Sequence, residues 1–462
     1  MANKASLDVV VIGAGLSGLH AAALLEAQGL NVLVLEAQDR VGGRIHSMRQ
    51  LGDNAEAGGT YIGAGYTRII DTAEKHGIEL IDVTRILEFF REQDLVLGEE
   101  IIRQTEWQAH PANPFPDADK ALLPWNYHRV LTMRDNPLPS PEAWTDPEHA
   151  TLDVPMHAWM QGKGLSDAAI KMGYGLNTTF GADANDVSAL LLLFRGAFSK
   201  AQRQQAPKNM LGFTADLGVQ RIPESMAAAL SHEVALNTEV VAIDEEADQI
   251  KLRCADGSVV SAARVVCSLP FGVLRRIAID PPLQGAQAEA VQQLAAQSIT
   301  QVYLAPKTPF WDNDGYAASL FTDSLPGMVA AVRSGNDPTT VTHLTAWVIG
   351  RFAQQIDALS EADAGQRVID AIEKIRPAAR GQLELIGLQS WGGDPSAAGA
   401  WAYYRPGEVT RFAEIMGKSR GRIHFCGEHL ALKSRGMEGA METGERAAQE
   451  ILSQDGPPVG AA

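Results

Sequence analysis

Near its amino terminus the chain reads Leu7-Asp-Val-Val-Val-Ile-Gly-Ala-Gly-Leu-Ser-Gly18, an apolar run followed directly by three spaced glycines. Such a run is typical of a parallel strand buried on both faces. Gly13 permits a tight turn, Gly15 lets the backbone approach a pyrophosphate, and Gly18 lets a helix pack closely on the strand. A second apolar run ends at Glu36, whose carboxylate can accept hydrogen bonds from ribose hydroxyls. The pattern predicts a βαβ unit that binds a dinucleotide, with the pyrophosphate at the helix N-terminus.

A glycine- and arginine-rich turn after this unit favours FAD over a nicotinamide cofactor. It reads Arg40-Val-Gly-Gly43-Arg44, and it can bring guanidinium groups to the other side of the same pyrophosphate, because the arginine fork matches phosphate oxygens. A solvated pair of surface arginines is the alternative interpretation. A second glycine turn, Gly59-Thr60, follows.

Composition limits the class of protein. The chain has 462 residues, a formal net charge of −17 and three cysteines in no metal-binding spacing. The length predicts two or three domains, and the acidic charge argues against nucleic acid and anionic membrane as partners. We expect no metal site and a reducing compartment. No leader segment and no apolar run of membrane-spanning length is evident, so a cytoplasmic location is expected. A homodimer is one assembly that the sequence allows.

Along the rest of the chain, segments that resemble the dinucleotide-binding unit in composition alternate with segments of a different composition. This alternation predicts two interleaved domains. We expect an α/β fold in which a Rossmann-like FAD-binding domain is interleaved with an α+β substrate-binding domain. The FAD-binding domain is expected to comprise residues 1–85, 210–285 and 385–462, and the substrate-binding domain residues 86–209 and 286–384. Within them we expect helices over 153–200 and 286–296, and strands at 238–244, 249–254 and 258–267 with a turn at Asp256-Gly257.

Four motifs together resemble the flavin monoamine oxidase family. They are Asp39-Arg-Val-Gly-Gly-Arg44, Ala57-Gly-Gly-Thr-Tyr-Ile-Gly63, Phe425-Cys-Gly-Glu428 and Gly436-Met-Glu-Gly-Ala440. The resemblance runs from about residue 7 to residue 452 and implies a substrate domain that caps a flavin. With the turns above, the cofactor-binding candidates are Gly13, Gly15, Gly18, Glu36, Arg40, Gly43, Arg44, Gly59, Thr60, Val240, Glu428 and Met437.

The resemblance implies roles for these residues: those that would hold the ADP and ribityl parts of FAD are Gly13, Gly15, Gly18, Glu36, Arg44 and Glu428. Val240 would contact adenine through its backbone. Met437, at a helix start, would offer a backbone N–H to the pyrimidine edge of the flavin. A helix N-terminus suits that place because reduced flavin carries negative charge there.

The sequence departs from the family where many relatives attach the flavin through a cysteine. Gly399 and Ala400 occupy that stretch and no cysteine is near, so we expect non-covalent FAD.

The substrate side departs from the family as well. Ala400 and Gly436 stand where two aromatic residues usually flank the amine, and Gln301 stands where a lysine usually lies near flavin N5. That lysine is thought to hold a water and assist the reaction with oxygen; Gln301 could hold a water without the charge. Trp401 is placed to fill the space of the missing aromatic cage from another angle. Gln301, Trp391 and Trp401 are therefore the candidate catalytic residues.

Other residues have simpler interpretations. Tyr174, Asn177 and Phe194 could line a pocket, but core packing is favoured, and His429 is expected to be structural. No arginine stands out in the sequence as a clamp for a carboxylate.

The leading hypothesis is oxidation of a small-molecule amine, with hydride transfer from the carbon next to nitrogen to FAD. The imine would hydrolyse to a carbonyl compound, and O2, forming H2O2, or another electron acceptor would reoxidise the flavin. The nearest alternative is a C–C desaturase or porphyrinogen-oxidase-like flavoenzyme. A nicotinamide dehydrogenase and a flavin-bearing binding protein without turnover are more distant ones.

Overall fold

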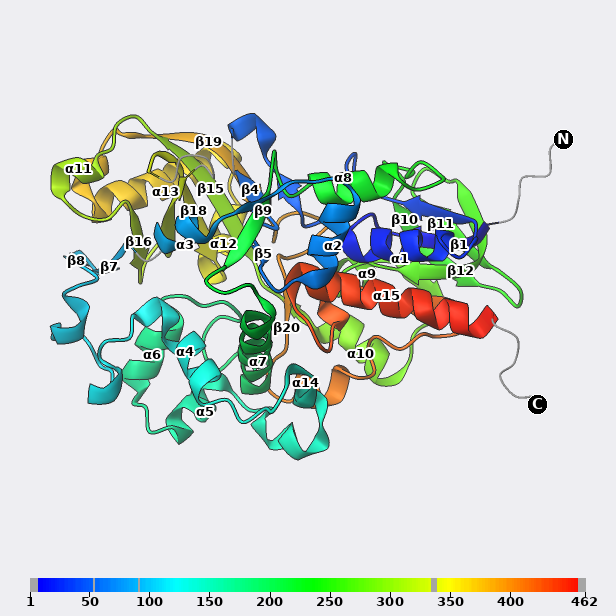
Figure 1. The fold of residues 1–462 in the computed structure, drawn as a ribbon, viewed down its shortest axis with the longest axis horizontal. Coiled ribbons are helices and arrows are strands. Elements are labelled where there is room, and N and C mark those ends of the chain that lie inside the picture. Colours follow the sequence, from blue (N-terminus) through cyan, green and yellow to red (C-terminus); the bar gives the residue numbers. More distant parts are fainter. Residues whose placement is uncertain (1–6, 53–54, 90–91, 334–338, 456–462) are drawn as a thin grey trace.

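The computed structural model describes residues 7–52, 55–89, 92–333 and 339–455. Two large sheets and a block of helices form the molecule, with the first sheet beside α1 and α15 at one end (Figure 1). The first sheet has the order β13-β10-β11-β12-β1-β2, and β21 also pairs with β12. Its strands are β1 (Leu7–Ile12), β2 (Val32–Leu35), β10 (Val240–Glu245), β11 (Ile250–Cys254), β12 (Val259–Cys267), β13 (Ala278–Asp280) and β21 (Ile423–Phe425).

The predicted βαβ unit is confirmed. β1 pairs in parallel with both β2 and β12, and Val9, Val10 and Val11 are fully buried, as an apolar strand covered on both faces requires. The helices around this sheet are α1 (Leu16–Glu26), α2 (Thr67–Lys75), α8 (Arg221–Ala228), α9 (Phe271–Leu274) and α15 (Gly436–Asp455). β10, β11 and β12 confirm the three strands expected between 238 and 267, and Gly257 has the positive φ of 86° that the turn needs.

The second sheet has the order β19-β15-β18-β17-β16-β7-β8 and is antiparallel except between β16 and β7. Val302 and Leu344 of this sheet pack with Val368 and Ile372 of α13 in one apolar core. The strands are β7 (Gln93–Leu97), β8 (Glu100–Ile102), β15 (Ile299–Pro306), β16 (Ser319–Thr322), β17 (Met328–Arg333), β18 (Val341–Ile349) and β19 (Leu383–Ser390). The helices at this sheet are α11 (Trp311–Asp314), α12 (Arg351–Asp357) and α13 (Glu361–Ile375).

Helices and short turns form the third part of the molecule, below the second sheet in Figure 1. Stacked aromatic rings hold it together: Trp144 on Phe194 with centroids 4.3 Å apart, and Phe115 on Tyr127 at 3.9 Å. Its helices are α4 (Tyr127–Arg134), α5 (Met156–Gly162), α6 (Asp167–Gly175) and α7 (Ala189–Gln205), joined by short 3-10 segments such as η5 (Pro141–Thr145) and η6 (Pro147–Leu152). The short helix α3 (Thr84–Phe89) is drawn level with the second sheet, above this block (Figure 1).

Residues of this block confirm the expected core packing. Tyr174 is buried and its hydroxyl donates to the carbonyl oxygen of Phe180 at 2.6 Å. Asn177 donates to the carbonyl oxygen of Trp125 at 2.9 Å.

Short elements connect these three parts. They are β3 (His46–Ser47), β4 (Glu56–Gly58), β5 (Ile62–Gly63), β6 (Leu80–Asp82), β9 (Gly212–Ala215), β14 (Ala295–Ala296), β20 (Ala402–Tyr403), α10 (Gly285–Gln293) and α14 (Glu408–Phe412). The helix expected over 286–296 therefore ends earlier, because Ala295 and Ala296 pair with β20 instead. The predicted domain boundaries stay a prediction; β19, which pairs with β15, spans the boundary at residue 385.

In the part of the chain that the structure covers, no helix combines the length and apolar character needed to cross a membrane.

Helices α1 and α15 approach one another with backbone against backbone. A Cβ added at Gly444 would lie 2.4 Å from the carbonyl oxygen of Ser17, closer than atoms can approach. Ser17 lies in the first turn of α1, so this contact positions the helix end that the sequence assigns to the pyrophosphate.

We expect Gly444→Ala to lower the free energy of unfolding by roughly 1–3 kcal/mol, since α1 and α15 must separate to admit a methyl group. Gly175→Ala is the matched control: it is also a helical glycine, but exposed and with nothing within 4 Å of the added Cβ. The control should be neutral or stabilising by about 0.5–1 kcal/mol. Denaturant unfolding of both variants measures the difference, and equal stability would contradict the close contact.

A buried carboxyl group holds β4 in place. Glu56 is 5% exposed; its Oε1 accepts from the backbone N–H of Val219 at 2.9 Å and its Oε2 from the hydroxyl of Ser47 at 2.7 Å. Burial raises the pKa of Glu56 from 4.5 to about 7 despite these bonds. The folded protein therefore holds a proton at Glu56 that the unfolded chain releases at a lower pH.

Because the folded-state pKa is raised, the contribution of Glu56 to stability is present below pH 4.5 and is lost as pH rises towards 7. This contribution to the free energy of unfolding amounts to at most about 3 kcal/mol. Glu56→Gln mimics the protonated acid, so the stability difference between the wild type and this variant should change across that interval. A difference that stays constant over this pH range would show that Glu56 does not titrate there.

Candidate active site

A cavity of about 650 Å³ lies where the two sheets and the helical block meet. This size is within the range of cofactor and substrate sites. Thirteen of the fifteen predicted site residues line it: Gly13, Gly15, Glu36, Gly43, Arg44, Gly59, Thr60, Val240, Gln301, Trp391, Trp401, Glu428 and Met437. The cavity therefore joins residues from widely separated segments of the chain.

The N-terminus of α1 forms one part of the wall. Gly15, Leu16 and Ser17 line the cavity, and the helix has neither a side-chain cap nor an acidic residue in its first turn. The first N–H groups of a helix have no partner within it and carry partial positive charge, which is the donor set that a phosphate needs. This part of the cavity fits a dinucleotide pyrophosphate.

Glu36 and Val240 lie at the ends of two strands of the first sheet. Glu36 Oε2 accepts from the N–H of Ala14 at 2.7 Å and Oε1 from the N–H of Gln38 at 2.9 Å. These bonds fix the carboxylate, and its remaining lone pairs can accept two ribose hydroxyls. Burial raises the pKa of Glu36, and the backbone bonds oppose that rise.

The carbonyl oxygen of Ala57 joins two of the candidate catalytic residues. It accepts from Gln301 Nε2 at 2.9 Å and from Trp391 Nε1 at 2.8 Å. Gln301 Oε1 in turn accepts from the hydroxyl of Tyr303 at 2.6 Å. The Gln301 amide is thus held on both sides and still carries a second N–H. This wall of the cavity is neutral and rigid.

Glu428 links two arginines across the cavity. Its Oε2 lies 3.6 Å from Arg44 Nη1, and its Oε1 lies 3.6 Å from Arg435 Nη2. Arg44 also donates to the carbonyl oxygen of Ala400 at 2.9 Å. Glu428 Oε2 is buried and makes no hydrogen bond to any described residue. A buried acceptor of this kind requires a donor, and a hydroxyl of a bound cofactor would supply one.

Trp401 lies beside the helical block. Its Nε1 donates to the carbonyl oxygen of Thr179 at 3.0 Å, and its ring meets Phe180 edge to face with centroids 6.3 Å apart. Ala400 and Gly436, at the usual positions of the aromatic cage, also line the cavity. Phe180 and Trp401 thus supply aromatic surface where the two small residues leave space.

Two predicted cofactor residues do not line the cavity. Gly18 has the packing role assigned to it, since a Cβ there would lie 2.2 Å from the carbonyl oxygen of Gly13. Arg40 Nη1 lies 3.5 and 3.3 Å from the carbonyl oxygens of Val41 and Ile45, so it holds its own loop rather than facing the cavity.

His429 is also outside the cavity wall. Its ring lies 4.5 Å from that of Phe271, and burial lowers its pKa to about 3, so the imidazole is neutral. A structural role is what these contacts support.

The sequence did not reveal three further residues of the wall: Tyr66, Arg129 and Arg195. One signal was present. Arg195 interrupts the apolar run Ala189-Leu-Leu-Leu-Leu-Phe194 of α7, and an arginine within a buried helical stripe calls for a partner.

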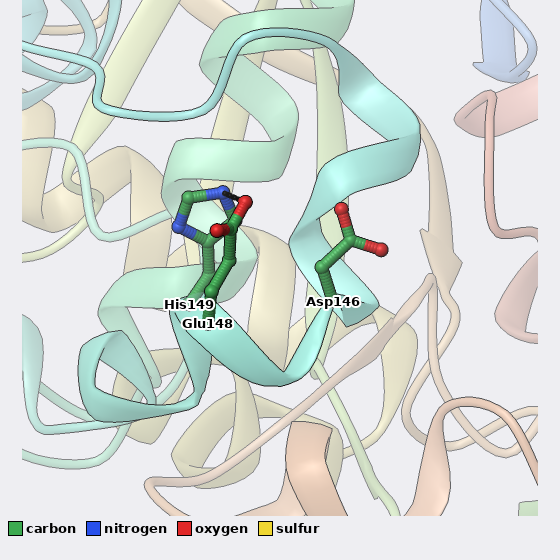
Figure 2. A group of neighbouring side chains, drawn as sticks. All are labelled: Asp146, Glu148 and His149. Carbon is green, nitrogen blue, oxygen red and sulfur yellow. Dashed lines mark ion pairs between the residues drawn. The ribbon is translucent and has the colours of Figure 1, made fainter.

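One group of acidic and histidine side chains lies apart from the cavity. Asp146, Glu148 and His149 place one ligand atom each within 4.8 Å of one another on η6 and the residue before it (Figure 2). His149 lies 3.5 Å from Glu148, and both carboxylates are exposed. Exposed groups of this kind are common without an ion, so they carry no metal assignment.

Comparison with known proteins gives a consistent result. The chain is 26% identical over 475 residues to the flavin-containing amine oxidase B of Homo sapiens, covering 98% of this chain and 87% of the relative. It is 25% identical to the flavin-containing amine oxidase of Danio rerio, covering 96% of this chain and 85% of that relative. Among solved structures, putrescine oxidase bound to putrescine shares its fold with a TM-score of 0.74 at 24% identity over 97% of this chain and 99% of that one. The cyclohexylamine oxidase of Brevibacterium oxydans IH-35A also shares the fold, with a TM-score of 0.76 at 22% sequence identity. This comparison covers 97% of this chain and 99% of that one.

The sequence model described as flavin containing amine oxidoreductase matches residues 16–452, nearly the whole chain. That match agrees with the cavity, whose wall includes the uncapped N-terminus of α1 and a buried carboxylate oxygen, Glu428 Oε2, without a hydrogen-bond partner among the described residues. The chain therefore belongs to the flavin containing amine oxidoreductases and is an FAD-dependent enzyme that oxidises amines.

Proposed function

We propose that FAD lies in the 650 Å³ cavity without a covalent bond, and that the amine is oxidised at the wall formed by Gln301, Trp391 and Trp401. The observation that carries the proposal is the continuity of this cavity: one wall includes the N-terminus of α1, and another includes the residues held by the Ala57 carbonyl. When bound, FAD supplies the two-electron oxidant that takes a hydride from the carbon next to the amine nitrogen.

The proposed roles in holding FAD follow from the contacts. The N–H groups of Gly15 and of the first turn of α1 bind the pyrophosphate, with Gly43 and Arg44 facing them. Glu36 accepts from the ribose, Val240 lies against the adenine, and Glu428 accepts a ribityl hydroxyl. Gly59, Thr60 and Met437 offer backbone groups to the remaining part of the flavin, Met437 from the first turn of α15.

Non-covalent binding is supported by the cysteines. No cysteine lines the cavity within the described part of the chain, and Cys254, Cys267 and Cys426 are all buried and free. Burial raises the pKa of Cys267 to about 11 and that of Cys426 to about 12, so neither thiol forms the thiolate that attachment requires. Free thiols also support the proposed cytoplasmic location.

Gln301, Trp391 and Trp401 are proposed to shape the reacting end of the cavity. All three are neutral, so they do not hold the amine in its protonated form, and hydride transfer from a neutral amine needs no strong base. The second N–H of Gln301 is proposed to hold a water without adding charge. The imine product is hydrolysed by water to a carbonyl compound, and O2 or another acceptor completes the cycle.

The first test combines acid precipitation with anaerobic titration of the purified protein. We expect a yellow protein whose FAD remains in the supernatant after precipitation, because nothing binds it covalently. Titration with a panel of amines and amino acids in the absence of air should bleach the flavin absorbance with at least one of them, and admitted air should restore it with formation of H2O2 if O2 is the acceptor.

Each part of this test has a contrary result. Colour retained in the pellet would contradict non-covalent binding. Flavin that neither an amine nor an amino acid bleaches would contradict the proposed amine oxidation and favour a substrate oxidised at a C–C bond. Bleached flavin that air does not restore would assign the oxidising step to another acceptor.

Glu36→Gln tests the assignment of the ribose end. The amide would turn a donor towards an N–H of Ala14 or Gln38 and lose an acceptor for the ribose, so we expect FAD affinity to fall roughly 10- to 100-fold. Apoprotein titrated with FAD, followed by protein fluorescence, measures the dissociation constant. Glu246→Gln, at an exposed loop position, is the control and should bind FAD like the wild type; equal weakening in both would reject the assignment.

A further inference from the structure

Three arginines from distant segments meet at the cavity. Arg129 belongs to α4, Arg195 to α7, and Arg435 directly precedes α15; all three line the wall. The guanidinium carbons of Arg195 and Arg435 lie 5.6 and 5.5 Å from the centroid of the Phe180 ring. That ring also contacts Trp401, so the arginines lie at the substrate end proposed above.

The charges in this cluster are poorly compensated. Within the described part of the chain, no carboxylate lies within 4 Å of the guanidinium of Arg129 or Arg195, and Arg435 has only Glu428, at 3.6 Å. Nη1 of Arg195 and Nε of Arg129 are buried without a hydrogen-bond partner among the described residues. Arg129 makes one contact of 3.4 Å, to the hydroxyl of Thr179.

Mutual repulsion adds to this imbalance. Burial lowers the pKa of Arg195 to about 9, and the charges of Arg129 and Arg435 act in the same direction. Removing an unpaired charge from water is costly. A cluster of like charges that is buried and incompletely paired therefore calls for an anion to complete it.

The phosphates of FAD already have a place elsewhere in the wall. The N-terminus of α1, Gly43 and Arg44 belong to the dinucleotide side, next to the first sheet. Arg129 and Arg195 instead belong to the helical block, which contributes none of the cofactor-binding candidates. The anion that this cluster fits is therefore part of the substrate.

The charge of the substrate follows from the same wall. A simple amine is positively charged in water, so three arginines would repel it, whereas an amine that carries an acid group is attracted by that group. Arginine guanidinium groups bind carboxylates through charge-assisted hydrogen bonds. We propose that Arg129, Arg195 and Arg435 form an anion subsite that binds the carboxylate of the substrate, so that the enzyme oxidises amino acids rather than simple amines.

This inference rests on the proposed function, and its test separates the two. Holoenzyme is reduced anaerobically with a panel of α- and ω-amino acids, each paired with the amine in which hydrogen replaces the carboxylate. We expect at least one amino acid to reduce the flavin with a second-order rate constant roughly 10-fold or more above that of its paired amine, because a charge-assisted bond is gained. If simple amines reduce the flavin equally well or better, the anion subsite is wrong and the proposed function stands. If neither amino acids nor simple amines reduce the flavin, both the anion subsite and the proposed function are wrong.

Arg195→Met tests the cluster directly. We expect kcat/KM for the preferred amino acid to fall roughly 10- to 100-fold, mainly through KM, because a charge-assisted bond is lost. The paired amine should react as well as before or faster, since repulsion is reduced. Arg203→Met is the matched control, because Arg203 lies on the same helix and is exposed; it should leave both substrates unchanged.

Two further measurements separate binding of the substrate carboxylate from a role of Arg195 in holding FAD. Arg195→Lys keeps a positive charge and should recover part of the lost affinity. The ratio of flavin to protein absorbance should be unchanged in both Arg195 variants. Loss of FAD from them would place Arg195 at the cofactor and overturn the proposal, as would an equal fall in kcat/KM for the amino acid and its paired amine.

Discussion

The close approach of α1 to the end of β1 and to α15 is the constraint on which the rest of the structure depends. At Gly18 only 2.2 Å would separate an added Cβ from the carbonyl oxygen of Gly13, and at Gly444 only 2.4 Å from that of Ser17. No side chain fits at either contact, so backbone packs on backbone. The N-terminus of α1 is thereby held at the cavity wall, where the first N–H groups of the helix are the donor set that an anion needs.

A second dependence runs through the carbonyl oxygen of Ala57. Gln301 comes from the second sheet and Trp391 from the loop after it, yet both donate to this one acceptor on β4. Glu56, the neighbouring residue, holds β4 through Ser47 and Val219. The part of the cavity wall that includes Gln301 and Trp391 is therefore positioned by β4, so the proposed substrate end and the proposed cofactor end are structurally connected.

One region of the cavity wall has a charge opposite to that of the whole chain. The protein carries a net charge of −17, but Arg129, Arg195 and Arg435 form one region of the cavity wall. Net charge describes long-range attraction and solubility, whereas affinity in an enclosed site depends on the few groups that lose water there. The proposed preference for a substrate with an anionic group therefore depends on these three arginines and not on the net charge.

The sequence by itself determined the βαβ unit and the strands at 240–267, and its motifs named thirteen of the residues that line the cavity. The βαβ unit and the strands depend on apolar runs and spacing within one short segment, whereas cavity residues such as Val240, Gln301 and Met437 were named through the resemblance to a family. Only the tertiary structure decided that Arg40 holds its own loop and that Gln301 shares an acceptor with Trp391. The same holds for the arginine cluster, whose members stand on three segments that have no local pattern in common. Their meeting depends on how α4, α7 and α15 pack, and packing between distant segments leaves no periodicity in the sequence.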